Sequence, residues 1–367
     1  MRVLATVERY APAIGGAERV VQRVAEGLAA RGHDVHVLTG GRPEEIELNG
    51  VRVHRVAVSG NEARGIDGDR AAVLDTIERV APDLVFNYAA QTWATDCCFA
   101  LLQRERRPRM VLAPCGFSGL GHRRYRRYFQ AMPSRLRSYD ALVLHSTVYQ
   151  DWKFASDAGA EPIVIVPNGA DPPAPRRRAA GEGQGERLAV TVGSHVLSKG
   201  HAQFARAIKV LARKRDLVGE IVAPERHGLD ALRGCQLSCS MRARRGAIRL
   251  IDGSAEGAVA SALAAADLFL FTSRVECAPL VILEAMAAGT PWVSFDVGNV
   301  SELAGGIVAR SHGELLDASR QILDGQRPEL GPAGRSAWES THRWESVLDR
   351  YEATFEDVLA APLVQAV

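Results

Sequence analysis

Short apolar runs alternate with longer amphipathic stretches along most of the chain. The apolar runs predict buried strands, and apolar residues spaced three and four apart between them predict helices. The predicted strands are residues 3–7, 35–39, 51–56, 84–88, 110–113, 141–144, 163–166, 188–192, 218–222, 248–250, 268–271 and 292–295. The clearest helices are residues 17–31, 74–80, 93–106, 125–136 and 344–359. Strands alternating with helices predict doubly wound α/β structure.

The strands fall into two groups that are separated by a proline-rich and then glycine-rich stretch. Such a composition is typical of a linker, and 367 residues are too many for one ordinary core. We therefore predict a first α/β domain at 1–168, a linker at 169–186, a second α/β domain at 187–343, and a final segment at 344–367. The alternative is one α/β domain with a long irregular tail, but the strand count of the second half argues against it. Two such domains would face each other across a cleft, where ligands often bind.

The composition narrows the class of protein further. A hydrophobic content of 47% with 24% charged residues is typical of a soluble globular protein, and a net charge of +2 gives no indication of nucleic-acid binding. No apolar run is long enough to span a membrane, and the first residues do not resemble a signal peptide. The six cysteines show neither a disulfide framework nor paired CxxC spacing, and Cys235 and Cys239 form only a weak pair. We expect reduced thiols, a cytoplasmic protein and no metal site.

The most informative motif is Glu276-Cys-Ala-Pro-Leu-Val-Ile-Leu-Glu284, which leads into Ala-Met-Ala-Ala-Gly289. Pro279 suits a first helical position and Gly289 suits a helix end, so we predict a helix over 279–288. The free N–H groups of its first turn would favour a phosphate. Glu284 would lean back toward that end, and Glu276 precedes it. Either carboxylate alone would be unremarkable, but together they suit a nucleoside diphosphate sugar, which offers hydroxyls on both sides of its pyrophosphate.

Two glycine-containing turns add weaker indications. Gly15-Gly16-Ala-Glu follows the first predicted strand and starts a helix, where a backbone can approach an anionic ligand closely. An ordinary strand-to-helix turn would look the same. The second turn, Val-Gly193-Ser-His-Val-Leu-Ser-Lys199-Gly200, carries one lysine that could hold a phosphate. A solvated lysine is the alternative, although a cation at a helix start is slightly disfavoured.

Two charged segments could indicate other functions, a metal site and a membrane contact. Asp67-Gly-Asp69 resembles a paired-aspartate metal motif, but no predicted strand leads into it, so we interpret it as a solvated turn. Arginines cluster at 104–109 and again at 123–127, the second time interleaved with aromatic residues. Such a run is more often a solvated face, but the cluster Arg123, Arg124, Arg126 and Arg127 could contact anionic lipid as a peripheral membrane site.

Taken together, these motifs resemble the retaining glycosyltransferases of family GT4, which have the GT-B architecture of two Rossmann-like domains. The resemblance spans nearly the whole chain, and only the Glu-x7-Glu string is specific. Its segments are Gly-Gly-Ala-Glu at 15–18, Val-Pro-Asn-Gly-Ala-Asp at 166–171, Val-Gly to Lys-Gly at 192–200, Glu-x7-Glu at 276–284 with its tail to 291, and Asp-Val-Gly-Asn-Val-Ser-Glu at 296–302.

The resemblance implies sugar transfer from a nucleotide donor, uridine-based by default, with retention of configuration and without a metal or other cofactor. The acceptor would be a glycan, a lipid-linked molecule or a small metabolite. The donor would lie mainly in the second domain, and the last helix would cross back to the first. Carried over, Lys199 would bind the pyrophosphate, Glu284 the ribose and Glu276 the transferred sugar. The remaining donor-binding residues would be Gly15, Gly16, Gly193, Ser194, His195, Ala278, Pro279, Leu280 and Val281.

The chain departs from the family pattern at two places. An arginine that commonly follows the glycine of the Val-Gly turn is here Ser194, so His195 or an arginine of the first domain would have to substitute. A family histidine that usually follows the strand at 110–113 is also absent, so the resemblance places Cys115, Phe117 or His122 on the acceptor side. The alternative function is a non-catalytic protein that binds a nucleotide sugar. A nicotinamide oxidoreductase is disfavoured, because neither half has the Gly-x-Gly-x-x-Gly pattern.

Overall fold

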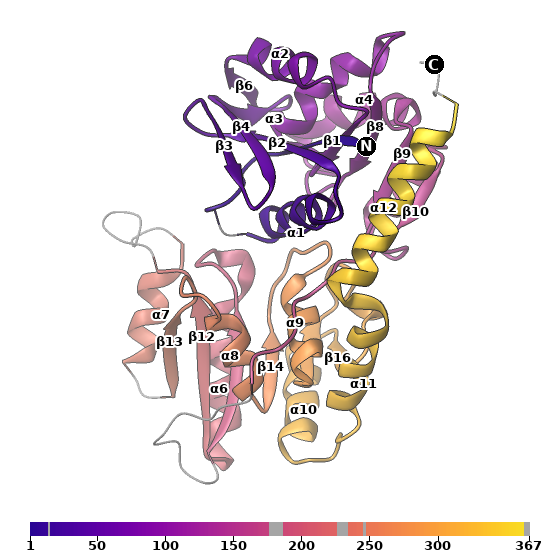
Figure 1. Ribbon diagram of the computed structural model, residues 1–367. Coiled ribbons are helices and arrows are strands. Elements are labelled where there is room, and N and C mark those ends of the chain that lie inside the picture. Colours follow the sequence, from indigo (N-terminus) through magenta and orange to yellow (C-terminus); the bar gives the residue numbers. More distant parts are fainter. Residues whose placement is uncertain (14, 176–185, 226–233, 245–246, 363–367) are drawn as a thin grey trace. The chain divides into compact units, whose positions relative to one another are not determined.

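A computed structural model describes residues 1–13, 15–175, 186–225, 234–244 and 247–362. The chain forms two compact units (Figure 1). The first unit consists of Met1–Asn168 and Trp344–Val367, and the second consists of Gly169–Arg343. The glycine-rich part of the expected linker, at 181–186, lies largely outside the described residues. The final segment, expected to return to the first domain, belongs to the first unit.

The first unit is built on one sheet in the order β10-β9-β8-β7-β1-β2-β4-β3. All neighbours are parallel except β3 and β4. Its strands are β1 (Arg2–Val7), β2 (Asp34–Gly40), β3 (Glu44–Leu48), β4 (Val51–Val56), β7 (Leu84–Tyr88), β8 (Arg109–Ala113), β9 (Ala141–Leu144) and β10 (Ile163–Ile165). Its α-helices are α1 (Gly16–Ala30), α2 (Arg70–Val80), α3 (Trp93–Asp96), α4 (Arg126–Ser138), α5 (Gln150–Asp157) and α12 (Trp344–Ala360).

The second unit has a fully parallel sheet in the order β13-β12-β11-β14-β15-β16. Two apolar clusters cover its two faces, one with α6, α7 and α10 and the other with α8, α9 and α11. Its strands are β11 (Arg187–Val192), β12 (Leu217–Ala223), β13 (Ile248–Asp252), β14 (Leu268–Phe271), β15 (Trp292–Phe295) and β16 (Gly306–Ala309). Its α-helices are α6 (His201–Leu211), α7 (Gln236–Ala243), α8 (Ala258–Ala265), α9 (Leu280–Ala288), α10 (His312–Leu323) and α11 (Leu330–Ala337).

Each sheet contains one point where the order of its strands reverses. In the first unit this point lies between β1 and β7, and in the second it lies between β11 and β14. Loops that follow such strands diverge to opposite faces, which leaves a crevice at the carboxyl ends where α/β proteins bind ligands. The fold therefore directs attention to the loops after β1, β7, β11 and β14.

Helix α12 completes the core of the first unit. Its Tyr351 and Phe355 are fully buried and contact the ring of Phe86 in β7. At the helix surface, Arg31 pairs with Asp349 and Glu352. The last helix is therefore part of the first core and not an appendage, although it follows the whole second unit in the sequence.

The structure contains strands that the apolar pattern did not indicate. They are β3, β16 and a separate antiparallel hairpin of β5 (Val58–Asn61) and β6 (Gly65–Gly68). The interpretation of Asp67-Gly-Asp69 as a solvated turn was therefore wrong in its secondary structure, because Asp67 and Gly68 lie in β6, but both aspartates are exposed. Asp69 caps α2, and its carboxylate accepts hydrogen bonds from the N–H groups of Ala71 and Ala72, both at 3.1 Å. The helix expected at 93–106 is also shorter, since α3 passes into a 3-10 helix at Cys97–Gln103.

The first arginine cluster is partly structural. The guanidinium of Arg107 is 1% exposed and pairs at 2.5 Å with Asp140, whose side chain is 3% exposed. Asp140 also pairs with Arg109 at 3.3 Å and accepts the N–H of Met110 at 2.8 Å. These contacts tie the start of β8 to the start of β9, so two arginines of this cluster serve the fold and are not available to a partner.

Replacing Asp140 by alanine should destabilise the first unit strongly. The change leaves the buried charge of Arg107 without its partner, and such a loss costs about 3–5 kcal/mol. Urea unfolding followed by circular dichroism would measure it. The control is Asp157→Ala, which removes an exposed pair with Lys153 and should cost less than about 1 kcal/mol. Equal losses in the two variants would contradict the structural role of Asp140.

Candidate functional site

Two loops of the second unit meet at the reversal point of its sheet. One follows β11 and carries Lys199, and the other follows β14 and carries Glu276. The ammonium of Lys199 lies 2.7 Å from a carboxylate oxygen of Glu276, and the two side chains are 28% and 12% exposed. The structure thus joins two residues that the sequence analysis selected separately. A partly buried cation and anion at this edge of the sheet can engage a charged ligand that also carries hydroxyls.

Close backbone contact holds these two loops together. Gly200 has φ +73°, and a Cβ atom at this position would lie 1.9 Å from the carbonyl oxygen of Thr272. The hydroxyl of Thr272 donates to the carbonyl of Gly200 at 3.0 Å, and the N–H of Arg274 donates to the carbonyl of Ser198 at 2.8 Å. Only glycine permits this approach, so the placement of Lys199 beside Glu276 depends on Gly200.

Helix α9 starts four residues after Glu276. It begins at Leu280, one residue later than predicted, because Pro279 has an extended ψ of 114° and precedes the helix as its N-cap. The predicted end is confirmed, since Gly289 follows Ala288 with φ +67°. The first N–H groups of a helix lack partners within it and attract anions. Glu284, one turn into the helix, is half-buried.

The segment after β15 supports the loop that carries Glu276. Gly298 has φ +58°, and a Cβ atom there would lie 2.3 Å from the carbonyl oxygen of Cys277. The N–H of Asn299 donates to that same carbonyl at 2.9 Å. The Asp-Val-Gly-Asn segment, which contributed to the resemblance, therefore fixes the backbone between Glu276 and α9.

Ser194 and His195 differ in their surroundings. Ser194 is exposed in the loop after β11, whereas His195 is 3% exposed and its ring lies beside Cys235 and His201. Facing a buried cluster, His195 is poorly placed to replace the missing arginine, so the suggestion that it does so is not supported by its position. Gly193 passes under Lys199, with a would-be Cβ atom 3.2 Å from the lysine side chain.

In the first unit, Gly15 and Gly16 begin α1 at the end of the β1 loop, as predicted. The side chain of Glu18 folds over Gly15, where a Cβ atom would lie 2.1 Å from its carboxylate. Glu18 also pairs with Arg9 at 2.8 Å. No described atom lies within 4 Å of a would-be Cβ atom on Gly16, so its backbone remains open to a close approach.

The three acceptor-side residues occupy unlike places. Cys115 is partly exposed and has φ +54°, which is uncommon for a residue other than glycine. Phe117 is fully buried against Phe129 and Phe154, so its expected role as a lining residue is corrected to that of a core residue. His122 is exposed, and its ring accepts the N–H of Arg124 at 3.2 Å.

His145 follows β9 and lies beside Cys115, and it was not among the predicted site residues. Its ring contacts the hydroxyl of Tyr88 at 3.1 Å and the carbonyl of Val166 at 3.0 Å. Burial opposes protonation, but the hydrogen bonds that the ring donates to Cys115 and to the Val166 carbonyl outweigh it and raise the pKa of His145. Burial raises the pKa of nearby Asp151, although the charge of His145 opposes this rise. The sequence signal that could have identified His145 is the position of a histidine directly after a buried strand.

The second arginine cluster is exposed at Arg123, Arg124, Arg126 and Arg127. The interleaved aromatic residues Tyr125, Tyr128 and Phe129 are buried in the core of the first unit. They are therefore not available to a membrane, and contact with anionic lipid stays a prediction that rests on charge alone. Within the described residues, no helix combines the length and the apolar character that a membrane span requires.

The fold and site define the class of protein. Two doubly wound units, each with one reversal of strand order and one with an anion-favouring helix start, are the architecture of GT-B proteins. A family model of Glycosyltransferase Family 4 matches residues 14–173, and a model of Glycosyl transferases group 1 matches residues 186–324. The chain belongs to the GT4-type glycosyltransferases.

Individual relatives agree with this assignment. The N-acetyl-alpha-D-glucosaminyl L-malate synthase of Bacillus anthracis is 30% identical over 115 residues, which are 28% of this chain and 29% of that protein. The chain thus matches under a third of this curated relative. Sucrose-phosphate synthase from Thermosynechococcus elongatus has a TM-score of 0.80 at 16% identity, over 98% of this chain and 100% of that structure. HepE of Anabaena, in complex with UDP and glucose, has a TM-score of 0.70 at 16% identity, with 97% and 100% covered.

Replacing Gly200 by alanine should separate the two loops of the site. The added Cβ atom meets the Thr272 carbonyl, so we expect a loss of stability of more than about 2 kcal/mol, beyond the cost of the left-handed backbone alone. The matched control is Gly257→Ala, which has the same φ of +73° but no atom within 4 Å, and should lose only about 1 kcal/mol. Thermal unfolding of both variants tests this, and similar losses would contradict the packing argument.

Proposed function

We propose that this glycosyltransferase moves a sugar from a nucleoside diphosphate sugar to an acceptor hydroxyl with retention of configuration. The observation that carries the proposal is the Lys199–Glu276 pair at 2.7 Å, set before the start of α9 at the sheet reversal. A pyrophosphate needs a cation and N–H donors, and a sugar needs hydroxyl acceptors. The two loops bring such a cation and such an acceptor together at one edge of the sheet, and N–H groups follow at the start of α9.

Each side chain takes a distinct role in this proposal. Lys199 turns from Glu276 to the pyrophosphate, which frees the Glu276 carboxylate to accept hydrogen bonds from the transferred sugar. The N–H groups at the start of α9 bind phosphate oxygens. Glu284 accepts hydrogen bonds from the ribose. Because the helix fixes the N–H groups before the donor arrives, they stabilise charge without reorganising during the reaction.

The chemical step breaks the bond between the sugar anomeric carbon and the phosphate oxygen and forms a bond from that carbon to the acceptor oxygen. The departing diphosphate takes the bonding electrons, and its new charge is stabilised by Lys199 and the helix N–H groups. The acceptor hydroxyl proton passes to the leaving phosphate oxygen. No metal takes part in this proposed step.

The donor and acceptor classes have separate support. HepE, with the same fold, is seen with UDP and glucose, which makes a uridine nucleotide the first donor to test. The acceptor is proposed to be a glycan, a lipid-linked molecule or a small metabolite. The named transfer to malate in the Bacillus anthracis relative is an example of a small acceptor. We propose that transfer occurs in the cytoplasm.

Removing the charge of Lys199 and removing that of Glu276 should have different effects on donor binding and on sugar transfer. Lys199→Ala should weaken UDP binding about 30-fold, because losing one partner of a partly buried charged contact costs about 2 kcal/mol. Glu276→Gln should keep UDP binding within about threefold and lower transfer about 100-fold, since it acts on the sugar. Calorimetry with nucleoside diphosphates and release of diphosphate from a donor panel would measure these effects.

The controls are Lys209→Ala and Glu256→Gln, which alter exposed charges of the same unit away from the two loops. Both should leave binding and transfer unchanged. If no nucleoside diphosphate binds the wild-type protein at millimolar concentration, the proposal fails. If a donor binds but no diphosphate is released with any acceptor extract, the non-catalytic binding protein is the correct alternative.

A further inference from the structure

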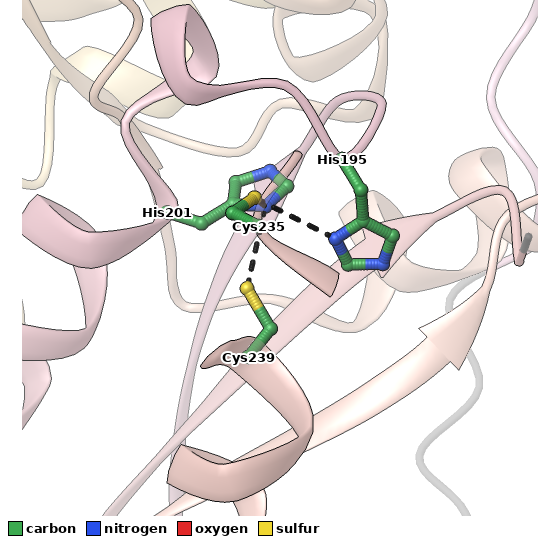
Figure 2. A group of neighbouring side chains, drawn as sticks. All are labelled: His195, His201, Cys235 and Cys239. Atoms are coloured by element: carbon green, nitrogen blue, oxygen red, sulfur yellow. Dashed lines mark hydrogen bonds between the residues drawn. The ribbon is translucent and has the colours of Figure 1, made fainter. Parts of the chain in front are cut away.

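Four metal-binding side chains come together beneath the loop that carries Lys199. They are His195, His201, Cys235 and Cys239, and their ligand atoms all lie within 4.8 Å of one another (Figure 2). The side chains are 3%, 2%, 7% and 1% exposed. From the sequence we expected no metal, because paired CxxC spacing is absent and Cys235 and Cys239 form only a weak pair. The two histidines lie more than thirty residues before these cysteines.

We propose that these four residues bind one Zn²⁺ ion. The Sγ atom of Cys235 lies 3.4 Å from Nδ1 of His201 and 3.8 Å from Nδ1 of His195, and Sγ of Cys239 lies 3.8 Å from Nδ1 of His201. Tetrahedral zinc, with bonds of about 2.3 Å to sulfur and 2.0 Å to nitrogen, requires ligand atoms about 3.3–3.8 Å apart. The ligand atoms therefore need to move only slightly closer together to coordinate an ion.

The donor set selects zinc over harder ions. Two thiolates and two imidazoles are the ligands of structural zinc sites, whereas Mg²⁺ and Ca²⁺ prefer oxygen. On binding, each thiol releases its proton to solvent and the sulfur coordinates as thiolate. All four positions come from the protein, so the site is closed and structural.

Local geometry brings the second pair of ligands to the first. Gly234 has φ +70°, and a Cβ atom there would lie 1.8 Å from the carbonyl oxygen of His195. The N–H of Cys235 donates to the same carbonyl at 3.3 Å. Cys239 follows one turn later on α7, with its N–H bonded to the carbonyl of Cys235 at 2.9 Å. One helical turn thus presents both sulfurs to the histidines.

The proposed metal brackets the lysine loop. His195 lies four residues before Lys199, and His201 lies two residues after it as the first residue of α6. An ion held by both histidines and by α7 would therefore fix both ends of this loop. The effect on donor binding rests on the proposed function, whereas the metal site itself does not.

Metal content of the tag-free wild-type protein is the direct test. Elemental analysis should give about one zinc per chain after purification in reductant. Cys235→Ser/Cys239→Ser should retain less than about a tenth of this. The control Cys98→Ala removes a thiol that is equally buried but lies in the first unit, and it should keep its zinc. Wild-type protein that stays below a tenth of a zinc per chain, even after incubation with zinc, would overturn the proposal.

Cobalt reports the coordination geometry in the wild-type protein, so the main test does not depend on variants that could misfold. Wild-type protein loaded with Co²⁺ should show the visible bands of a tetrahedral site and a sulfur-to-cobalt charge-transfer band. Cys239→His replaces one thiolate ligand by an imidazole and keeps four ligands. The tetrahedral bands should therefore persist, with about half the charge-transfer intensity. Cobalt bands typical of octahedral oxygen coordination, or thiol titration showing a Cys235–Cys239 disulfide in reduced preparations, would overturn the site.

Donor titration separates the two proposals. Chelation should weaken UDP binding about tenfold, and added zinc should restore it, as expected for coupled neighbouring sites. Unchanged UDP affinity on chelation would overturn the anchoring of the lysine loop. A zinc-loaded protein that binds no nucleotide at all would overturn the proposed function and leave the metal site supported.

Discussion

The contact between Gly200 and the carbonyl of Thr272 is the constraint on which the candidate site depends. It joins the loops after β11 and β14, which leave the sheet at the point where the strand order reverses. With this contact in place, the Lys199 ammonium reaches Glu276, which lies in the loop that leads into α9. The sheet order brings the two loops to one edge of the sheet. The missing side chain of Gly200 then decides whether Lys199 and Glu276 meet there.

Much of the fold could be predicted from local pattern. The strands β9 and β14 match the predicted residues, because fully buried parallel strands are continuous apolar runs. Strand β3 was missed, since its residues are largely exposed at the sheet edge and only Ile46 and Leu48 among them are apolar. Its turn was nevertheless readable: Asn49 and Gly50 both have positive φ, and Asn-Gly is the strongest short hairpin signal. The early end of α3 had no comparable local signal.

The candidate site shows a similar limit. Lys199, Glu276 and the end of α9 could be found because each sits in a distinctive turn or cap. Their ion pair could not, since it joins residues far apart in the sequence. The buried pair of Arg107 and Asp140 was likewise hidden within an apparent basic surface. The cluster of His195, His201, Cys235 and Cys239 has no fixed spacing, and tertiary packing alone assembles it.

The departure at Ser194 and the cluster at His195 concern adjacent residues of one loop. With serine in place of arginine, the loop after β11 carries a single cation, so the cationic contact of this loop with a pyrophosphate would depend on the position of Lys199. A single lysine is a compact charge on a flexible stem, and it loses more affinity than an arginine fork when its support is loose. Fixing the backbone on both sides of Lys199 would reduce the entropy lost on binding. Under the two proposals together, a rigid loop with one cation would replace a looser loop with two.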